Sequence, residues 1–490
     1  MPTISDLKET REKKFIALKQ SGCDPYPAIV EKDCEIGKAR SSDGQDVKVV
    51  GRITAIRGHG KIFFIDIQDE SGKLQGVFKA DAIPASSYAL LEQIDLGDFL
   101  AVQGSVGKTQ AGEVSIFVRD FQIIAKSFRP LPDQWYGLKD KEERYRKRYL
   151  DLLMNPDVKK VFETRSKIIR SVREFFDEKG FLEVETPTLQ PLYGGANARP
   201  FETHHHALDI DLFLKISDEL YLKRLIIGGF EKVYEIDKDF RNEGIDKSHN
   251  PEFTMMECYW AYANYQDMMK LTEELYEHVA RTVLGTTTIE YQGVQIELKA
   301  PWKRMTMTDA LKELGGIDVK TMSDEDLLAL IKQHGLVYEG NPQLTGVGEG
   351  FKRGIAIATL FEIVEPKLIQ PTFITDFPKE TTALCKQKAS DPALIERFEP
   401  YINGWEIGNA YSELNNPIIQ KEFFEEQQKA KASGDAEAHP MDTDFIEAME
   451  YGMPPTGGLG LGIDRMVMFL TNQPTIRDVL LFPTMKPEKG

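Results

Sequence analysis

A chain of 490 residues with 41% hydrophobic residues is long enough for two to four domains with large cores. Charged residues make up 28%, which argues against disorder, and no run of 18 apolar residues predicts a membrane span. A net charge of −17 is unusual for a nucleic-acid-binding protein, but residues 1–150 hold 24 Lys and Arg against 22 Asp and Glu. The acidic excess therefore lies in residues 151–490.

Residues 1–46 form an N-terminal segment with a mixed-charge helical pattern over residues 5–20. Asp6, Glu9 and Glu12 argue against a signal or transit peptide, so we expect a cytoplasmic protein. The four cysteines are widely spaced and form no C-x-x-C pair, which favours free thiols over a zinc knuckle or a disulfide framework.

Residues 47–127 contain five β-prone segments separated by Gly-containing turns, a pattern that predicts a small five-stranded barrel. If alternate residues of F-F-I-D-I face the barrel core, Phe64 points outward beside strands that carry Arg57 and Gln75. An outward Phe flanked by Arg and Gln can stack on one base and read its edge. An exposed Phe without a function is the more common case for an isolated residue.

Residues 128–150 are predicted to be a linker between two domains. Pro130 and Pro132 stiffen its start, and the run Arg144 to Arg148 is basic. Such a run is usually a solvated face. Its place between domains leaves contact with a nucleic-acid backbone as the alternative.

The stretch F-R-N-E-G-I-D-K-S-H-N-P-E-F-T-M-M-E-C-Y, from Phe240 to Tyr259, follows the β-prone run V-Y-E-I. It predicts two antiparallel strands with a long loop between them. Arg241, Glu243, Glu257 and Tyr259 can then share one sheet face, because side chains repeat with period two. Unpaired charges are costly to bury, so this face predicts a binding floor; the alternative is the solvated side of an amphipathic hairpin.

Other stretches place polar groups among glycines or β-prone residues. Gly195 lies in the Gly-rich segment Y-G-G-A-N-A-R-P-F, where backbone can approach a small ligand, and Glu219 lies at the start of a predicted helix. Glu399, Glu406 and Glu413 recur every seven residues, but glycines between them favour hairpin strands, whose carboxylates suit a hard cation.

Several of these segments resemble one family. F-R-N-E with H-N-P-E-F-T-M-M-E resembles motif 2 of the class II aminoacyl-tRNA synthetases, specifically the class IIb lysyl-tRNA synthetase family. The helix and strand of residues 157–187 resemble motif 1, and P-P-T-G-G-L-G-L-G-I-D-R resembles motif 3. G-R-I-T-A-I-R with F-F-I-D-I-Q-D resembles the anticodon-binding barrel shared by lysyl, aspartyl and asparaginyl synthetases.

The resemblance implies an α+β fold: an N-terminal OB-fold barrel followed by a class II catalytic domain, residues 151–490, built on an antiparallel sheet flanked by helices. Residues 304–350 would be a helical insertion in that domain. The departure E-T-T-A-L-C-K at Glu380 to Lys386 stands where the family has Ser-Pro-Leu-Ala, so we carry over no substrate contact from Thr382, Ala383 or Cys385.

The resemblance also implies site residues. The catalytic residues would be Arg241 and Arg465. ATP would be bound by Arg241, Glu243, His249, Asn250, Phe253, Glu399 and Arg465. Lysine would be bound by Gly195, Glu219, Arg241, Glu257, Tyr259, Asn409, Tyr411 and Glu413. Arg57, Phe64 and Gln75 would hold the anticodon, and Glu399 and Glu406 would bind Mg²⁺.

The expected activity is ATP-dependent ligation of L-lysine to lysine tRNA through a lysyl-adenylate, with AMP and pyrophosphate released. The expected partners are ATP, L-lysine, lysine tRNA and a second copy in a homodimer, with no DNA and no membrane. A lysyl ligase acting on a protein acceptor is one alternative, although such enzymes typically lack the barrel. An aspartyl or asparaginyl synthetase is another, but it would need cationic or neutral groups where Glu257 and Glu413 stand.

Overall fold

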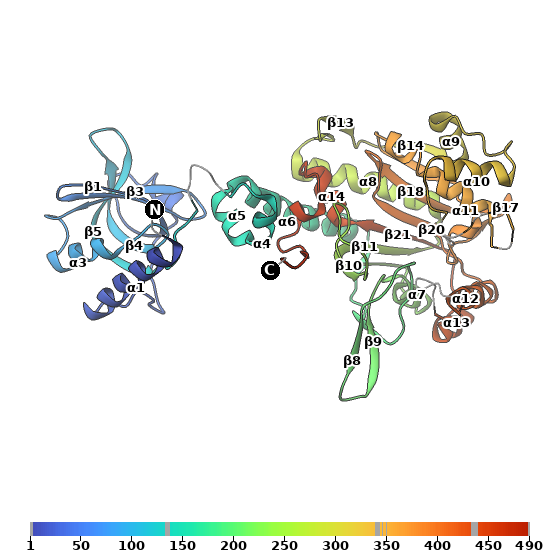
Figure 1. The fold of residues 1–490 in the computed structure, drawn as a ribbon, viewed down its shortest axis with the longest axis horizontal. Helices are drawn as coiled ribbons and strands as arrows, with labels where there is room; N and C mark the ends of the chain where they lie inside the picture. The colour runs from blue at the N-terminus through green and yellow to red at the C-terminus, as the bar shows by residue number, and fades with distance from the viewer. Residues whose placement is uncertain are drawn as a thin grey trace. The chain divides into compact units, whose positions relative to one another are not determined.

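The computed structural model describes residues 3–132, 138–338, 344, 346–348, 350–432 and 440–488. The chain divides into two compact units, one up to Lys139 and one from Asp140 onward, and each is described here by itself (Figure 1). Among the helices of these residues, none has the length and apolar character needed to cross a membrane.

The first unit is a closed five-stranded barrel, so the predicted barrel is confirmed. Its strands follow the order β1-β2-β3-β5-β4 and span Asp46–His59, Ile62–Gln68, Lys73–Lys79, Val114–Ala125 and Phe99–Lys108 respectively. Ile65 and Ile67 of β2 are fully buried in the barrel core, whereas Phe64 is half-buried and points to the other face. The alternation expected from the sequence is therefore present.

Arg11 of helix α1 (Ile4–Gln20) holds this helix to the segment that follows β5, the last strand of the barrel in the chain. The Arg11 guanidinium donates to the carbonyl oxygens of Ser127, at 2.9 Å, and Arg129, at 3.1 Å. Leu18 on the same helix is fully buried in the barrel core. Short helices α2 (Ile36–Ala39), α3 (Ala85–Ala89) and η1 (Leu90–Gln93) complete this unit.

The second unit is built on a mostly antiparallel sheet with the order β14-β15-β18-β20-β21-β11-β10-β6. In that order the strands span Lys303–Thr306, Thr372–Thr375, Arg397–Ile402, Gly408–Ser412, Thr456–Gly462, Glu252–Ala261, Lys232–Phe240 and Leu182–Glu183. β19 (Trp405–Glu406) pairs with β18. Only the outermost pairs, β14 with β15 and β6 with β10, are parallel. The predicted antiparallel sheet is confirmed.

Helices α6 (Pro156–Glu178), α8 (Tyr265–Leu284) and α14 (Ile463–Leu470) bury one face of this sheet in the main core (Figure 1). Phe176 of α6 stacks on Tyr234 of β10 with ring centroids 4.9 Å apart. Met256 and Cys258 of β11 lie in the same core and are fully buried. Because strand side chains alternate, the residues between them face the opposite side of the sheet.

Further elements surround this sheet. The helices α5 (Arg148–Met154), α7 (Glu219–Ile227), α12 (Pro417–Ala432), α13 (Thr443–Glu450) and α15 (Ile476–Val479) border it. Smaller sheets pair β12 with β13 (Thr288–Tyr291, Val294–Glu297), β16 with β17 (Gln387–Lys388, Asp391–Ile395), and β7, β9 and β8 (Leu189–Gln190, Ile210–Leu214, Glu202–His205).

The region predicted as a helical insertion, residues 304–350, contains α9 (Met307–Gly315) and α10 (Asp324–Gln333). Its first residues differ from that prediction, because Lys303–Thr306 is strand β14 of the main sheet. The helices also continue beyond residue 350, since α11 (Arg353–Phe361) packs with α9 and α10 around one apolar cluster. This cluster is shared with strand residues of the main sheet, so the segment is packed onto the sheet.

The predicted linker, residues 128–150, is partly helical in the described residues, and residues 133–137 lie outside them. Helix α4 (Lys141–Arg146) and the start of α5 belong to the second unit. Arg148 is buried, pairs with Asp151 at 2.6 Å, and donates to the carbonyl oxygens of Leu480 and Leu481. Arg144 pairs with Asp151 at 2.7 Å and so links α4 to α5, and Arg148 links α5 to the C-terminal carbonyls. Arg146 and Lys147 pair with Glu142 and Glu143, each four residues earlier in the chain.

Replacement of Arg148 by Ala is expected to destabilise the second unit by about 3 kcal/mol, because it leaves a buried carboxylate and several carbonyls without a donor. Lys147→Ala is the matched control, since Lys147 pairs with Glu143 at the surface and its loss should change stability by less than about 1 kcal/mol. Calorimetric unfolding of both variants measures the difference. Equal stability of the two variants would contradict a buried structural role for Arg148.

Candidate active site

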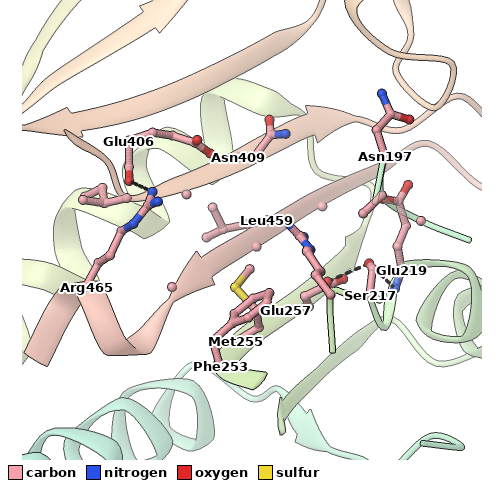
Figure 2. Close-up of a pocket in the computed structure, with 18 of the residues that line it drawn as sticks. Asn197, Ser217, Glu219, Phe253, Met255, Glu257, Glu406, Asn409, Leu459 and Arg465 are labelled. Atoms are coloured by element: carbon pink, nitrogen blue, oxygen red, sulfur yellow. Dashed lines mark hydrogen bonds between the residues drawn. The ribbon is translucent and has the colours of Figure 1, made fainter. Parts of the chain in front are cut away.

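A cavity of about 400 Å³ opens on the sheet face opposite the main core. Figure 2 shows Glu406 and Arg465 at one end of this cavity and Ser217 and Glu219 at the other. Its lining includes every residue predicted for catalysis, ATP, lysine or metal except Glu399: Gly195, Glu219, Arg241, Glu243, His249, Asn250, Phe253, Glu257, Tyr259, Glu406, Asn409, Tyr411, Glu413 and Arg465.

Strand register brings the central residues of the floor together. On β11, Glu257 lies opposite Gly460 of β21, which in turn lies opposite Asn409 of β20. One pleat along, Tyr259, Gly458 and Tyr411 form the same kind of row. Because residues in register share a face, two polar rows cross three adjacent strands.

The glycines of β21 leave room for the side chains on both sides. A Cβ atom at Gly458 would lie 2.0 Å from Glu413 Oε1 and 2.6 Å from Tyr259 Cε1. Only a residue without a side chain fits between these two groups. The glycines of β21 therefore make the cavity deeper, and they also let neighbouring groups pack closely against this strand.

Glu257 is buried and held by neutral donors. Its Oε1 accepts from Ser217 Oγ at 2.8 Å and from the Asp218 backbone N–H at 3.3 Å, and its Oε2 accepts from Tyr259 OH at 3.3 Å. Burial, together with the nearby charge of Glu219, raises the pKa of Glu257 to about 7. The carboxylate is thus positioned, and no cation among the described residues pairs with it.

Glu219 and Glu413 share a cation that the sequence interpretation did not include. Lys223 Nζ lies 2.5 Å from Glu219 Oε1 and 2.5 Å from Glu413 Oε2. Burial acts to lower the pKa of Lys223, but the two carboxylates outweigh it and raise the pKa above its ordinary value. Burial also raises the pKa of Glu219 to about 7, against the opposing effect of Lys223.

Arg241 lies over the ring of Phe253, with 5.0 Å from its guanidinium carbon to the ring centroid. Its buried Nε has no hydrogen-bond partner in the described part of the chain. Beside it, burial and the charges of Asp218 and Glu257 raise the pKa of Asp239 well above its ordinary value. A guanidinium with an unused donor at a cavity wall is suited to an anionic ligand group.

At the other end, Arg465 lies in the first turn of α14, at the end of the third motif, and donates to the backbone carbonyl of Glu406 (Figure 2). The preceding residue, Asp464, is buried and accepts from the Thr254 backbone N–H at 2.8 Å. Asp464 also pairs with Arg165 of α6 at 2.5 Å. These contacts hold the start of α14 against β11. They therefore fix the position from which the Arg465 side chain extends.

Glu399, predicted to bind a metal with Glu406, does not line the cavity. It pairs with Arg397 and accepts from Tyr401 OH at 2.7 Å. Burial and the charge of Glu399 raise the pKa of Glu406 to about 7, which shows that the two carboxylates are close enough to repel each other. Within the described residues, no three His, Cys, Asp or Glu side chains form a complete metal cage.

The loop residues predicted to bind ATP differ in their exposure and in whether their polar groups are already hydrogen-bonded. His249 is exposed and its Nδ1 lies 2.8 Å from Asp246 Oδ2, and Glu243 is also exposed. The Asn250 amide is already used by the protein: Nδ2 donates to Glu252 O at 2.6 Å and Oδ1 accepts from the Thr484 backbone N–H at 3.1 Å. Asn250 therefore shapes the loop in this structure.

Arg397 is a further cavity residue that the sequence interpretation missed. Its Nε donates to Asn409 Oδ1 at 3.1 Å, and Asn409 Nδ2 lies 2.8 Å from Tyr411 OH. Thr382, from the segment that departs from the family pattern, also lines the cavity. The residue spacing gave no signal for either position, because both reach the cavity from neighbouring strands and turns.

In the barrel, Arg57 and Phe64 lie directly opposite each other on β1 and β2, and Gln75 lies opposite Asp66 two residues further along β2. All four side chains therefore share one barrel face. Arg57 pairs with Asp66 at 2.9 Å, and Gln75 Oε1 accepts from Ser115 Oγ at 3.2 Å. The sequence interpretation missed Asp66, which is buried and orients Arg57.

Comparison with known families agrees with this architecture. Residues 140–486 match the model described as tRNA synthetases class II (D, K and N), and residues 47–124 match that of the OB-fold nucleic acid binding domain. The chain belongs to the class II tRNA synthetases. The resemblance inferred from the three motifs and the barrel is thereby confirmed.

Relatives within this synthetase family are similar along the whole chain. A lysine–tRNA ligase of Pelotomaculum thermopropionicum is 51% identical over 99% of this chain and 96% of its own length. Lysine–tRNA ligases of Carboxydothermus hydrogenoformans and Moorella thermoacetica are 51% and 50% identical, each over 99% of both chains.

Proposed function

We propose that this synthetase joins L-lysine to lysine tRNA at the expense of ATP, through a lysyl-adenylate. The single observation that carries the proposal is the group of three buried carboxylates, Glu219, Glu257 and Glu413, at one end of the cavity. The names of relatives at about half identity over the full length support the same activity.

The amino-acid end suits a ligand with two ammonium groups. Glu219 and the backbone at Gly195 would bind the α-ammonium, and Glu257, Glu413 and the Tyr259 hydroxyl would surround the ε-ammonium. Tyr411 would form the wall beside the methylene chain. A neutral or acidic side chain would leave these buried carboxylates unpaired, which argues against aspartate and asparagine as substrates.

Two arginines would bind the negatively charged groups. Arg241 would bridge the lysine carboxylate and the α-phosphate, and Arg465 would contact the far phosphates and cover the adenine. The carboxylate oxygen attacks the α-phosphorus, pyrophosphate leaves, and a ribose hydroxyl of tRNA then attacks the lysyl carbonyl to release AMP. The guanidinium groups stabilise the charge that grows on the phosphate oxygens, so no nucleophilic side chain is needed.

Glu399 and Glu406 fit a magnesium ion. Burial and the charge of Glu399 raise the pKa of Glu406 despite the arginines nearby, and Mg²⁺ is commonly held by one or two carboxylates together with substrate phosphates. When bound, the ion would neutralise part of the phosphate charge. The residues themselves are oriented by Arg397, Tyr401 and Arg465.

The barrel would bind the anticodon, with one base stacked on Phe64 and its edge read by Arg57 and Gln75. This feature argues against a ligase that modifies a protein acceptor. We also infer a homodimer and a cytoplasmic location. Leu182, in the segment that resembles motif 1, and Leu189, two residues after that segment, are 48% and 47% exposed, which supports a partner subunit there.

The proposed activity predicts ATP–pyrophosphate exchange that depends on lysine when the standard amino acids are tested one at a time. A lysine tRNA transcript should then be charged with lysine in the presence of ATP. Exchange with aspartate or asparagine but not with lysine would contradict the assigned specificity. Exchange with lysine but no charging of the transcript would contradict tRNA as the acceptor.

The pKa values of Glu219 and Glu257, both raised to about 7, predict a pH-dependent affinity for lysine. These carboxylates must lose their protons to pair with the ammonium groups, so binding weakens as the pH falls through 7. The KM for lysine should rise by about tenfold or more between pH 7 and pH 6. The KM for lysine is measured at saturating ATP and Mg²⁺ at each pH, so that protonation of Glu406 at the nucleotide end does not enter the comparison. A KM for lysine that stays constant across this range would contradict the account.

A further inference from the structure

Lys223 is a buried cation paired with two carboxylates that line the proposed amino-acid pocket, and nothing in the motifs assigns it a role. Its side chain is fully buried, and its ammonium lies at 2.5 Å from a carboxylate oxygen of both Glu219 and Glu413. Glu219 is the first residue of α7, whereas Glu413 directly follows β20. Lys223 therefore connects two walls of the cavity that are far apart in the sequence.

Only two of the three pocket carboxylates, Glu219 and Glu413, pair with Lys223 in the described residues. Glu257 is held only by the neutral donors Ser217, Asp218 N–H and Tyr259. Glu413 Oε1 has no hydrogen-bond partner among the described residues, so it remains available to a ligand. When all three carboxylates are ionised, Lys223 balances one of them, and two negative charges are left for a ligand.

We propose that Lys223 determines specificity by setting the charge of this pocket, so that two unbalanced carboxylates match a ligand with two ammonium groups. It acts through Glu219 and Glu413, and is a positioning residue that need not touch the substrate. The inference rests on the proposed function, since L-lysine is the ligand that carries the two ammonium groups.

Other titratable groups surround this site. Burial and nearby carboxylates raise the pKa of Asp218 to about 8 and that of Asp239 well above its ordinary value, and Lys215 pairs with Asp218 at 2.6 Å. Burial raises the pKa values of Tyr259 on β11, Tyr411 on β20 and Cys385 above their ordinary values, so these groups stay neutral. Arg397 on β18 is charged but is paired with Glu399. Glu219, Glu257 and Glu413 line the amino-acid end of the cavity, and Lys223 pairs with two of them. These four groups therefore set the charge that a ligand meets there.

A purely structural role is the alternative. Glu219 and Lys223 are four residues apart on α7, a spacing at which ion pairs stabilise helices, and removing Lys223 would leave two buried carboxylates unpaired. A structural clamp would affect stability and overall activity. A structural clamp would also couple Lys223 to Glu413, but that coupling would appear in the melting temperature and in kcat. A charge-setting role places the coupling in the KM for lysine and in the acid limb of the pH profile.

The test compares wild-type protein with K223M, E413Q and the double variant K223M/E413Q in lysine-dependent ATP–pyrophosphate exchange. E413Q should raise the KM for lysine by about 100-fold, because Lys223 is left with one carboxylate and repels the incoming ammonium. In the double variant the charge of the pocket returns to its original value. Its KM should therefore be about tenfold lower than that of E413Q.

The pH profile of kcat/KM for lysine tests the role of Lys223 independently of the double variant. Without Lys223, the carboxylates lose a counter-ion and hold their protons more tightly, so the acid limb of kcat/KM for lysine in K223M should move up by about one pH unit. Melting temperatures of all variants monitor folding, and K223Q replaces K223M if the latter does not fold. K270M, at an exposed position on α8, is the matched control and should leave the KM for lysine unchanged.

Effects of K223M and E413Q that simply multiply in the double variant, or an acid limb that does not move, would overturn the role of Lys223. These outcomes leave the proposed function intact as long as wild-type protein shows exchange with lysine. Absence of that exchange in wild-type protein would overturn the proposed function itself. The two failures are therefore distinguishable.

Discussion

The site depends on the alternation of side chains along strand β11. Met256 and Cys258 point into the main core, so Glu257 and Tyr259 must point to the opposite face. The same register places Gly458 and Gly460 beside them on β21, and the missing side chains there make the cavity. A shift of one residue would send the carboxylate into the core and an apolar side chain into the cavity, so the core packing enforces the chemistry.

Burying three carboxylates in one pocket is unfavourable unless each is compensated. The protein compensates Glu257 with hydroxyl and backbone donors and compensates Glu219 and Glu413 with Lys223. This compensation is incomplete, which is why burial raises the pKa values of these groups. The remaining unfavourable energy is relieved when a ligand supplies ammonium groups. The empty site is therefore less stable than a fully compensated one, and binding of such a ligand removes this destabilisation. The free energy recovered contributes to affinity and selectivity.

Much of this could be predicted from the sequence, because contiguous motifs report local structure. The β10–β11 hairpin, the Gly-rich third motif and the five-stranded barrel each follow from periodicity and turn residues, and the family resemblance implied most of the cavity lining. Lys223, Arg397 and Asp66 were missed because their importance comes from partners distant in the chain or on neighbouring strands. The basic run at Arg144–Arg148 was similarly ambiguous, since its pairing with Asp151 and with C-terminal carbonyls is visible only in three dimensions.

The central claim is that charge, rather than size, selects the amino acid. The most direct test is calorimetric binding of L-lysine and of L-norleucine, which has the same carbon chain but no ε-ammonium. If the buried carboxylates recognise that ammonium, norleucine should bind at least about 100-fold more weakly than lysine at pH 7.5, because Glu257 and Glu413 would be left unpaired. Equal affinities for the two ligands would contradict the account.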